Sequence, residues 1–572
     1  MRLHAAAWAV LIFIAACGQS LAGGDPGGDD YGGGADAGGA GTPECYSSSE
    51  CPVGWTCSEF GTCVPPTSPP SGDAGVPPPP EIEYDISPPA SSLHFVWVAM
   101  TELDALARID GTSLEVHSVA VGDRPKVLAT MPGTDTAVVL DQSNGAATVV
   151  RAAVGGDATE VYRTLPHLNR IAASRDGRYA VAFFDLARAI AEAGSLEGVG
   201  ELGSFQDVTV LSVEPGHERP VDLTVGFKPR DVQFDAAGAR AYVVTDDGVS
   251  IIDLAAVASG APTIVPPVPV TDDPLGDASG VEVNVVASGD YAVVRTPGLA
   301  QVRVVRLTGP DAGTGWNLAL PSMPTDIDVA PDGQRVYAVM RDPAGLAVID
   351  VPGDALDPSG ITLVDLAGAS SGSLTLSADG RRGLLYTNAT LDERITVIDL
   401  VAPGFPRVTR RLEKSVRAVA FDPTGAHAII VHARAPGDPG DATTVDEVID
   451  RSPGYSSFDV ASGFAKLQIT PVDPGAFTFA PGAPRAYLIL DGGDADGATA
   501  AVQEVRFDSG VIHTTALSSP PEAVGILPGQ GASETKVFVS QRHPLGRVTF
   551  IDVTSGQVRT LTGFDLNSRV ID

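Results

Sequence analysis

One pattern returns from about residue 93 to the C-terminus, and it restricts the fold more than any other feature of the chain. Each copy has an alternating strand, an Asp/Gly turn, a strand with a central aromatic residue, a second turn and an apolar strand ending in Ile-Asp. A further strand follows. The clearest copies are residues 228–254, 323–351 and 371–400. The period-two alternation and the turn residues predict four short antiparallel strands per copy.

The length of the repeat is set by the aspartates that end the third strand. These are Asp110, Asp253, Asp350, Asp399, Asp459, Asp508 and Asp552. The last five intervals are 97, 49, 60, 49 and 44 residues, so 97 spans two copies. An aromatic residue of the second strand recurs in the same way, at Tyr179, Tyr242, Tyr291, Tyr337, Tyr386, Tyr487 and Phe538. We count about ten units in the repeat region.

Four-stranded units of this length in tandem predict an all-β protein, a β-propeller of antiparallel blades. A lone sheet has two bare faces, and radial stacking of blades covers both. Seven or eight blades are the alternative to ten, with some units degenerate. The first unit lacks a strand before Trp97, and residues 563–572 follow the last complete unit. We therefore expect that C-terminal segment to supply the missing strand and close the ring.

Two short segments carry a family resemblance. They are Val121-Gly122-Asp123-Arg124-Pro125, which matches a blade-to-blade turn, and Trp97-Val98-Ala99, which matches a second strand. With them the repeats resemble the bacterial YVTN/quinoprotein-like propeller repeats. The resemblance implies a propeller over residues 92–572. It does not imply an activity, because one fold hosts many functions.

The N-terminus reads as an export signal. A short basic start precedes an apolar run of about a dozen residues, too short to span a bilayer and typical of a signal peptide. Residues 14–17, Ile-Ala-Ala-Cys, resemble the bacterial lipobox. This resemblance implies cleavage after residues 1–16 and lipidation of Cys17. Gly18 in place of Asp favours the outer membrane, with the periplasmic or surface side left open.

Three short segments follow the lipidation site. Residues 17–43 are rich in Gly and Asp and predict a disordered tether. Residues 44–64 form a cysteine module that contains Cys45, Cys51, Cys57 and Cys63. In an exported protein these predict two disulfides, with three connectivities open. A four-cysteine zinc site is the alternative, although the equal spacing does not match the usual zinc pattern. Residues 65–91 are a proline-rich linker.

The net charge of the chain is −34. A field of this sign repels nucleic acid and anionic lipid headgroups, so the composition excludes nucleic-acid binding. The membrane contact is therefore expected through the lipid alone. We expect a monomeric propeller that binds a protein or glycan partner in the cell envelope.

Few residues suggest chemistry, and we predict no catalytic residue. Asp491, Asp494 and Asp496 lie in one expected hairpin loop and are a candidate calcium site. An EF-hand would need Glu at the twelfth loop position, where Val502 stands, so a solvated turn without any cofactor is the other interpretation. His427 and His432 are five residues apart on a predicted strand, which places them on opposite faces of the sheet.

Two units carry long insertions, residues 184–205, partly helical around 186–193, and residues 432–457. Insertions in propellers lie on one rim and often shape a binding surface, and neutral loop variation is the alternative. The sequence therefore favours a lipid-anchored envelope protein whose propeller is a binding or scaffolding module. The alternative is an envelope enzyme of lactonase or quinoprotein type, acting at the central channel of the propeller.

Overall fold

The computed structural model describes most of the repeat region. The described residues are 90–141, 145–153, 156–214, 219–260, 263–273, 276–492, 500–529 and 534–564, with the four short strands β1 to β4. The chain divides into two units, residues 19–79 and the remainder. In the smaller unit β2 (Thr56–Cys57) pairs antiparallel with β3 (Cys63–Val64). In the larger unit β1 (Ala15–Ala16) pairs with β4 (Tyr84–Asp85).

Besides the β1–β4 pair, the described residues of the larger unit form ten antiparallel sheets of three or four strands, which we number as blades in chain order. Blade 1 comprises β5 (Phe95–Met100), β6 (Ala105–Asp110) and β7 (Val116–Ala120). Blade 2 comprises β8 (Pro125–Thr130), β9 (Thr136–Asp141), β10 (Ala146–Arg151) and β11 (Ala158–Arg163). Blade 3 comprises β12 (Arg170–Ala173), β13 (Tyr179–Phe183), β14 (Asp207–Ser212) and β15 (Arg219–Thr224). Blade 4 comprises β16 (Asp231–Phe234), β17 (Arg240–Thr245) and β18 (Gly248–Asp253), and blade 5 comprises β19 (Glu282–Val285), β20 (Tyr291–Arg295), β21 (Gln301–Arg306) and β22 (Gly315–Ala319).

The second half continues the same order. Blade 6 comprises β23 (Pro324–Val329), β24 (Arg335–Arg341), β25 (Ala344–Asp350) and β26 (Thr362–Asp365). Blade 7 comprises β27 (Ser373–Leu376), β28 (Arg382–Tyr386), β29 (Arg394–Asp399) and β30 (Arg407–Arg411). Blade 8 comprises β31 (Val416–Phe421), β32 (His427–His432), β33 (Gly454–Asp459) and β34 (Phe464–Ile469). Blade 9 comprises β35 (Pro474–Phe479), β36 (Arg485–Leu490), β37 (Ala501–Arg506) and β38 (Ile512–Ala516), and blade 10 comprises β39 (Pro521–Leu527), β40 (Lys536–Gln541), β41 (Arg547–Asp552) and β42 (Val558–Thr562).

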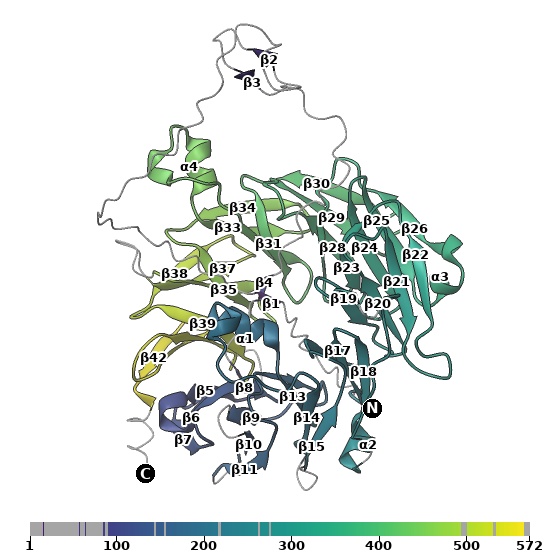
Figure 1. Ribbon diagram of the computed structural model, residues 1–572. Helices are drawn as coiled ribbons and strands as arrows, with labels where there is room; N and C mark the ends of the chain where they lie inside the picture. Colours follow the sequence, from purple (N-terminus) through teal and green to yellow (C-terminus); the bar gives the residue numbers. More distant parts are fainter. Residues whose placement is uncertain are drawn as a thin grey trace, which may run out of the picture. The chain divides into compact units, whose positions relative to one another are not determined.

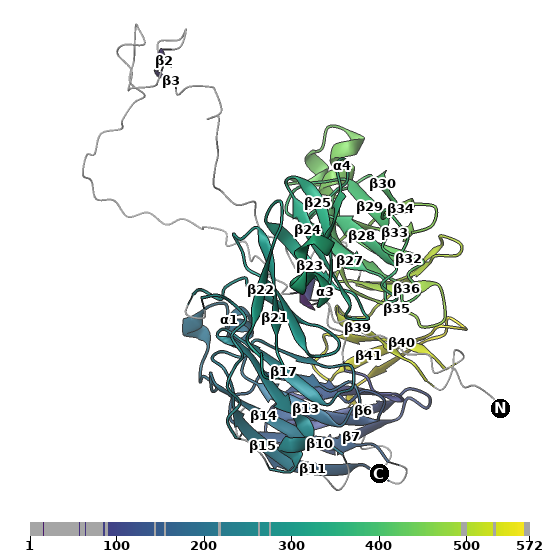
Figure 2. The same ribbon diagram turned by 90° about the vertical axis from the view of Figure 1, so that its right-hand side faces the viewer.

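The blades follow one another around a propeller, as Figure 1 and Figure 2 show. First strands of neighbouring blades lie side by side, for example β8 beside β12 and β35 beside β39, so the first strand of each sheet is innermost. The apolar faces of adjacent sheets pack together; β21 of blade 5 and β24 of blade 6, for instance, share one buried cluster. The ten-blade propeller predicted from the repeat is confirmed.

Two blades have three strands in place of four, for different reasons. In blade 1 only Ser91 bridges to Val96 where a first strand would stand, as the sequence predicts. In blade 4 the chain leaves β18 through the short helix α2 (Leu254–Ala258). It then bridges back to two sheets, from Ile264 to Thr224 of blade 3 and from Val268 to Val249 of blade 4. This segment replaces the outer strand and joins blades 3 and 4.

Blades 1 and 10 pack face to face and close the ring. Their shared buried cluster joins Val96 and Ile109 of blade 1 with Phe538 and Phe550 of blade 10. Phe564 is buried in the same cluster. The predicted closing strand, residues 563–572, lies outside the described residues from 565 onward. In the described part, the two ends are joined by this side-chain packing and by a hydrogen bond from the Ser91 hydroxyl to the carbonyl oxygen of Ile526, at 3.1 Å.

The strand order defines two faces of the propeller. Because neighbouring strands run in opposite directions, loops between strands 1 and 2 and between strands 3 and 4 lie at the same end of a blade. We call this end the hairpin face. The opposite end, the insertion face, carries the loops between strands 2 and 3 and the connectors between blades. Helix α3 (Gly353–Leu356) follows a third strand and so belongs to the hairpin face.

The remaining two helices lie on the insertion face. Helix α1 (Leu186–Ala193) lies between β13 and β14, where the sequence predicts a helix, and α4 (Val445–Arg451) lies between β32 and β33. Figure 2 shows both helices projecting beyond the sheets. Both predicted insertions thus emerge on one face. None of the helices in the described residues has the length and hydrophobicity that crossing a lipid bilayer requires.

Candidate functional site

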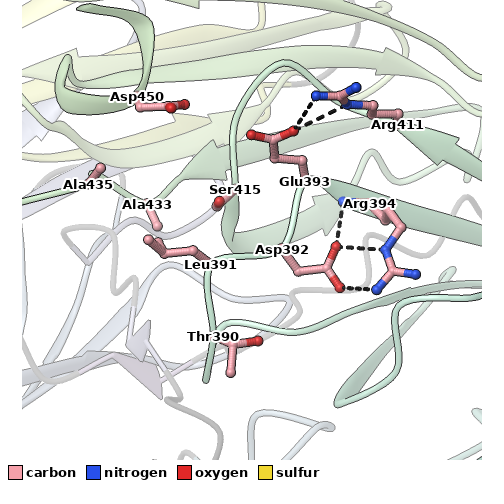
Figure 3. A pocket seen from close by; sticks show the side chains of 10 residues that line it. All are labelled: Thr390, Leu391, Asp392, Glu393, Arg394, Arg411, Ser415, Ala433, Ala435 and Asp450. Atoms are coloured by element: carbon pink, nitrogen blue, oxygen red, sulfur yellow. Dashed lines mark hydrogen bonds and ion pairs between the residues drawn. The ribbon is translucent and has the colours of Figure 1, made fainter. Parts of the chain in front are cut away.

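A cleft opens on the insertion face between blades 7 and 8. One wall is the loop after β28, and the other is the insertion after β32 that carries α4. Its volume is about 530 Å³. Its lining residues are Thr390, Leu391, Asp392, Glu393, Arg394, Arg411, Ser415, Ala433, Ala435 and Asp450, shown in Figure 3. The cleft therefore combines apolar side chains, carboxylates and guanidinium groups.

Two ion pairs order the blade 7 wall of the cleft. Arg394 holds Asp392 with both ends of its guanidinium group, at 2.9 Å from Nε to Oδ1 and 2.8 Å from Nη2 to Oδ2. Arg411 pairs with Glu393 at 3.1 Å. The Asp392 side chain is mostly buried, whereas that of Arg411 is 83% exposed. A two-point pair at a mostly buried carboxylate keeps its geometry better than an exposed pair does.

The blade 8 wall is held by a buried lysine. Lys414 is fully buried, and its Nζ donates hydrogen bonds to the carbonyl oxygens of Ile449, at 2.6 Å, and Asp450, at 2.8 Å. These carbonyls end α4, where helices have unpaired acceptors and a partial negative charge. Burial lowers the pKa of Lys414, and the charge of Asp450 acts in the opposite direction. Since α4 has no buried side chain, this contact is a main attachment of the helix.

A buried Ser–His pair lies next to Lys414. The Nε2 of His432 is 2.7 Å from the Oγ of Ser456, and its Nδ1 is 3.1 Å from the carbonyl oxygen of Ser415. A neutral ring that donates from Nδ1 and accepts from the hydroxyl satisfies both contacts. Burial lowers the pKa of His432 to about 4, and the Lys414 charge acts in the same direction.

The arrangement of this pair resembles an activated serine, but its burial argues against catalysis. His432 is 1% exposed and Ser456 is 2% exposed. A nucleophile and its base must reach the substrate, and these atoms lie between two packed sheets. We therefore assign the pair a structural role beneath the cleft. The sequence does not point to Lys414 or Ser456, because neither lies in a recognisable motif.

The histidines of β32 lie as the strand spacing predicts. His432 faces blade 7, whereas His427 stacks on Phe507 of blade 9, with 4.7 Å between ring centroids. His427 also contacts Asp422, at 3.3 Å. The two rings are therefore on opposite faces of the sheet and form no common metal site.

Most other predicted site residues fall outside the described part of the chain. Asp491 forms an ion pair with Arg542, but Asp494 and Asp496 lie outside the described residues, so the calcium site stays a prediction. Cys17, Cys45 and Cys51 also lie outside them. Cys57 and Cys63 stand opposite each other in the backbone register of β2 and β3. Within the described residues, no group of three or more His, Cys, Asp or Glu side chains is arranged to hold a metal ion.

The polar residues of several innermost strands join neighbouring blades. Gln233 of blade 4 donates to the carbonyl of Val283 and accepts from the N–H of Val285, both in blade 5. Asp326 of blade 6 accepts from the N–H of Leu374 in blade 7. These side chains therefore hold the innermost strands of neighbouring blades together.

Exposed apolar side chains gather on the insertion face. Ten of the large exposed apolar residues lie in its described loops and connectors: Leu103, Leu196, Leu202, Phe227, Leu299, Met323, Leu391, Val445, Val448 and Leu545. On the hairpin face there are four in the described loops: Leu93, Leu356, Val401 and Val511. Single exposed apolar residues are normal, but a bias toward one face marks a candidate interaction surface.

Comparisons with known proteins add little to this description. No family model and no curated protein matches the chain. Among solved structures, the dihydro-heme d1 dehydrogenase NirN in complex with DHE is 13% identical, with 86% of this chain and 77% of that chain covered and a TM-score of 0.37. Apo AztD from Citrobacter koseri is 15% identical, with coverages of 68% and 95% and a TM-score of 0.37. A eukaryotic initiation factor is 9% identical, with coverages of 74% and 96% and a TM-score of 0.46. At these values we base no functional conclusion on the similarities.

Proposed function

We propose that this chain is a lipid-anchored cell-envelope protein whose propeller binds a partner through its insertion face. The sequence supports the anchor, through the export signal and the lipobox-like residues that end at Cys17. The proposed location is the outer membrane. The tether and the proline-rich linker would then separate the propeller from the lipid.

The observation that carries the binding role is the difference between the two faces. The cleft between blades 7 and 8, both long insertions and most of the exposed apolar loop residues all lie at one end of the blades. Rigid sheets that present variable loops are a common way to build a binding surface. The Ser–His pair is buried, so it does not favour a hydrolytic enzyme over a binding module.

The anchor is tested by the variant Cys17→Ala in cells. We expect the parent protein in the detergent phase and the variant in the aqueous phase, because two or more acyl chains hold a protein firmly on a membrane. A variant that stays in the detergent phase would contradict the anchor.

The binding face is tested by site-specific photo-crosslinking in the same cells. A photoreactive amino acid at Leu299 or Leu545 reports on the insertion face, and one at Val401 or Val511 is the matched control on the hairpin face. We expect one discrete adduct from the insertion face and none from the control positions. Equal adducts from both faces, or none from either, would contradict the proposal.

A further inference from the structure

The cleft between blades 7 and 8 exposes an apolar surface. Leu391, on the blade 7 wall, is 61% exposed. Figure 3 shows it between Ala433 and Asp392, with Ala435 beyond Ala433 on the blade 8 wall. A leucine this exposed contributes little to the fold, yet it would bury apolar area if a partner covered it.

The cleft walls also carry an excess of negative charge. The loop 387–394 and the insertion 433–453 together hold seven carboxylates and three arginines. Adding Arg411 and the buried Lys414 still leaves two more carboxylates than cations. Within the described part of the chain, the Asp450 carboxylate has no hydrogen bond or ion pair, and Figure 3 shows it on the wall opposite Glu393.

The backbone of Asp450 is held in place before any partner arrives. The backbone carbonyl of Asp450 accepts a hydrogen bond from the Nζ of Lys414 and another from the N–H of Ala435, at 2.9 Å. The backbone of this residue is therefore held from two sides. A group that is already in place loses less conformational entropy when it binds a partner, which favours recognition.

We propose that this cleft binds a basic, amphipathic segment of a protein partner. An apolar side chain of the segment packs on Leu391 and the two alanines, and its lysine or arginine side chains approach Asp450 and Glu393. This inference deepens the proposed function and rests on it. The chain charge of −34 favours encounter with a basic partner.

A membrane surface fits the same cleft less well. Leu391 is followed directly by Asp392 and Glu393, and Val445 by Asp446 and Glu447. Inserting these apolar residues into a bilayer would bring the carboxylates to the headgroups, and burying charge is costly. A cationic, amphipathic polypeptide can contact the apolar side chains and the neighbouring carboxylates at the same time.

The test uses the full-length Cys17→Ala chain and a defined probe. The probe is a fluorescein-labelled peptide of about 18 residues with leucine and lysine at helical spacing. A peptide of the same composition in shuffled order is the control. We expect the amphipathic peptide to bind at least ten-fold more tightly than the shuffled one by fluorescence anisotropy, and binding to weaken as salt is raised.

Two matched double variants locate the site. Leu391→Ser with Asp450→Asn should weaken binding of the amphipathic peptide at least ten-fold, because it removes the apolar contact and one charge. Leu356→Ser with Asp357→Asn removes the same groups from the hairpin face, where Leu356 is 68% exposed, and should change binding less than two-fold. Equal binding of the two peptides, or equal effects of the two variants, would overturn the inference.

A flotation experiment decides between the two classes of partner. The same Cys17→Ala chain is mixed with phosphatidylcholine vesicles. If the Cys17→Ala chain floats with the vesicles and the Leu391→Ser, Asp450→Asn variant does not, the cleft binds a membrane, and the proposal of a protein partner is overturned. Failure of peptide binding leaves the crosslinking result unchanged, so this inference and the proposed function fail separately.

Discussion

The two faces of the propeller are built from the same blades but differ in how regular they are. On the hairpin face, an aspartate that ends the third strand accepts N–H groups of the following turn in several blades. Asp399 accepts from Val401 and Ala402, both within 2.9 Å, and Asp110 and Asp552 do the same in their blades. An Asx turn of this kind closes a hairpin without other support. The repeated aspartate is therefore a structural signal.

The insertion face has no such uniform element. Its loops range from the two-residue turn after β17 to the long insertion after β32. Blades 7 and 8 show the contrast directly, since they border a cleft at each end. The cleft on the insertion face has about 530 Å³ and the one on the hairpin face about 250 Å³. Repetition at one end keeps the blades uniform, and variation at the other end leaves room for recognition.

The largest effect is expected from Lys414→Met. The change removes the donor of two charge-assisted hydrogen bonds and leaves the Asp450 carbonyl with the N–H of Ala435 as its remaining partner, which should cost roughly 4 kcal/mol of unfolding free energy. Denaturant unfolding measures it, and limited proteolysis should cut the insertion 433–453 first.

The control for Lys414→Met is a cation on the hairpin face. Arg335 pairs with Asp350 while both side chains are 43% or more exposed. Arg335→Met should cost less than about 1 kcal/mol, because exposed ion pairs contribute little. Equal losses in the two variants would mean that water replaces Lys414 at the end of α4 and that the lysine does not hold the insertion.

The next largest effect is a dependence of stability on pH through His432. The pKa of His432 is lowered from 6.5 to about 4. Between these two pH values the unfolded chain binds a proton at this histidine and the folded chain does not. The stability present above pH 6.5 should therefore fall as the pH drops through this window, by about 3 kcal/mol at pH 4.

The variant His432→Asn separates this effect from the titration of carboxylates. Asparagine can keep the donor to the Ser415 carbonyl at the position of Nδ1, and it does not titrate. The unfolding free energy of the parent relative to that of the variant should fall by about 3 kcal/mol between pH 7 and pH 4. Parallel curves would show that His432 is not held neutral in the fold.

The sequence predicts the propeller because most blades repeat the same local chemistry. Tyr242, Tyr337 and Tyr487 are buried in second strands, and Asp253, Asp350 and Asp552 end third strands. The missing first strand before Trp97 and the helix at residues 186–193 are predicted in the same way. These are short-range signals, so one sequence is enough to find them.

The candidate site could not be predicted in the same way, because it depends on contacts across blades. Lys414 is a connector residue that bonds α4, some 35 positions later in the chain, and nothing in its own segment indicates burial. The wall residues Leu391 and Ala435 come from different blades. Such convergence depends on how two sheets pack, which alternation and turn residues do not encode.

A smaller effect is expected from Asp399→Ala on the hairpin face. The variant loses the acceptor for the N–H groups of Val401 and Ala402, which should cost about 1 kcal/mol. Those bonds lower the pKa of Asp399 in the folded chain. The stability lost in the variant should therefore be largest above the pKa that Asp399 has in the unfolded chain, and it should vanish as the pH falls through the lower pKa of the folded chain. Asp399→Asn keeps an acceptor and should lose less. A loss of peptide binding in either variant would contradict the division between the two faces.

The smallest effect on stability is expected from Leu391→Ser. This leucine is 61% exposed and belongs to no buried cluster in the described residues. The unfolding free energy of the variant should therefore stay within about 0.5 kcal/mol of that of the parent protein. Ile395→Ser, four residues away in β29 and fully buried, is the matched control and should cost several times more, by about 3 kcal/mol. Chemical denaturation of both variants tests the contrast. If Leu391→Ser lost more than about 1 kcal/mol, Leu391 would be a packing residue of blade 7. Leu391 would then no longer count among the exposed apolar residues that distinguish the insertion face, and the cleft between blades 7 and 8 would lose the apolar contact that its proposed docking role needs.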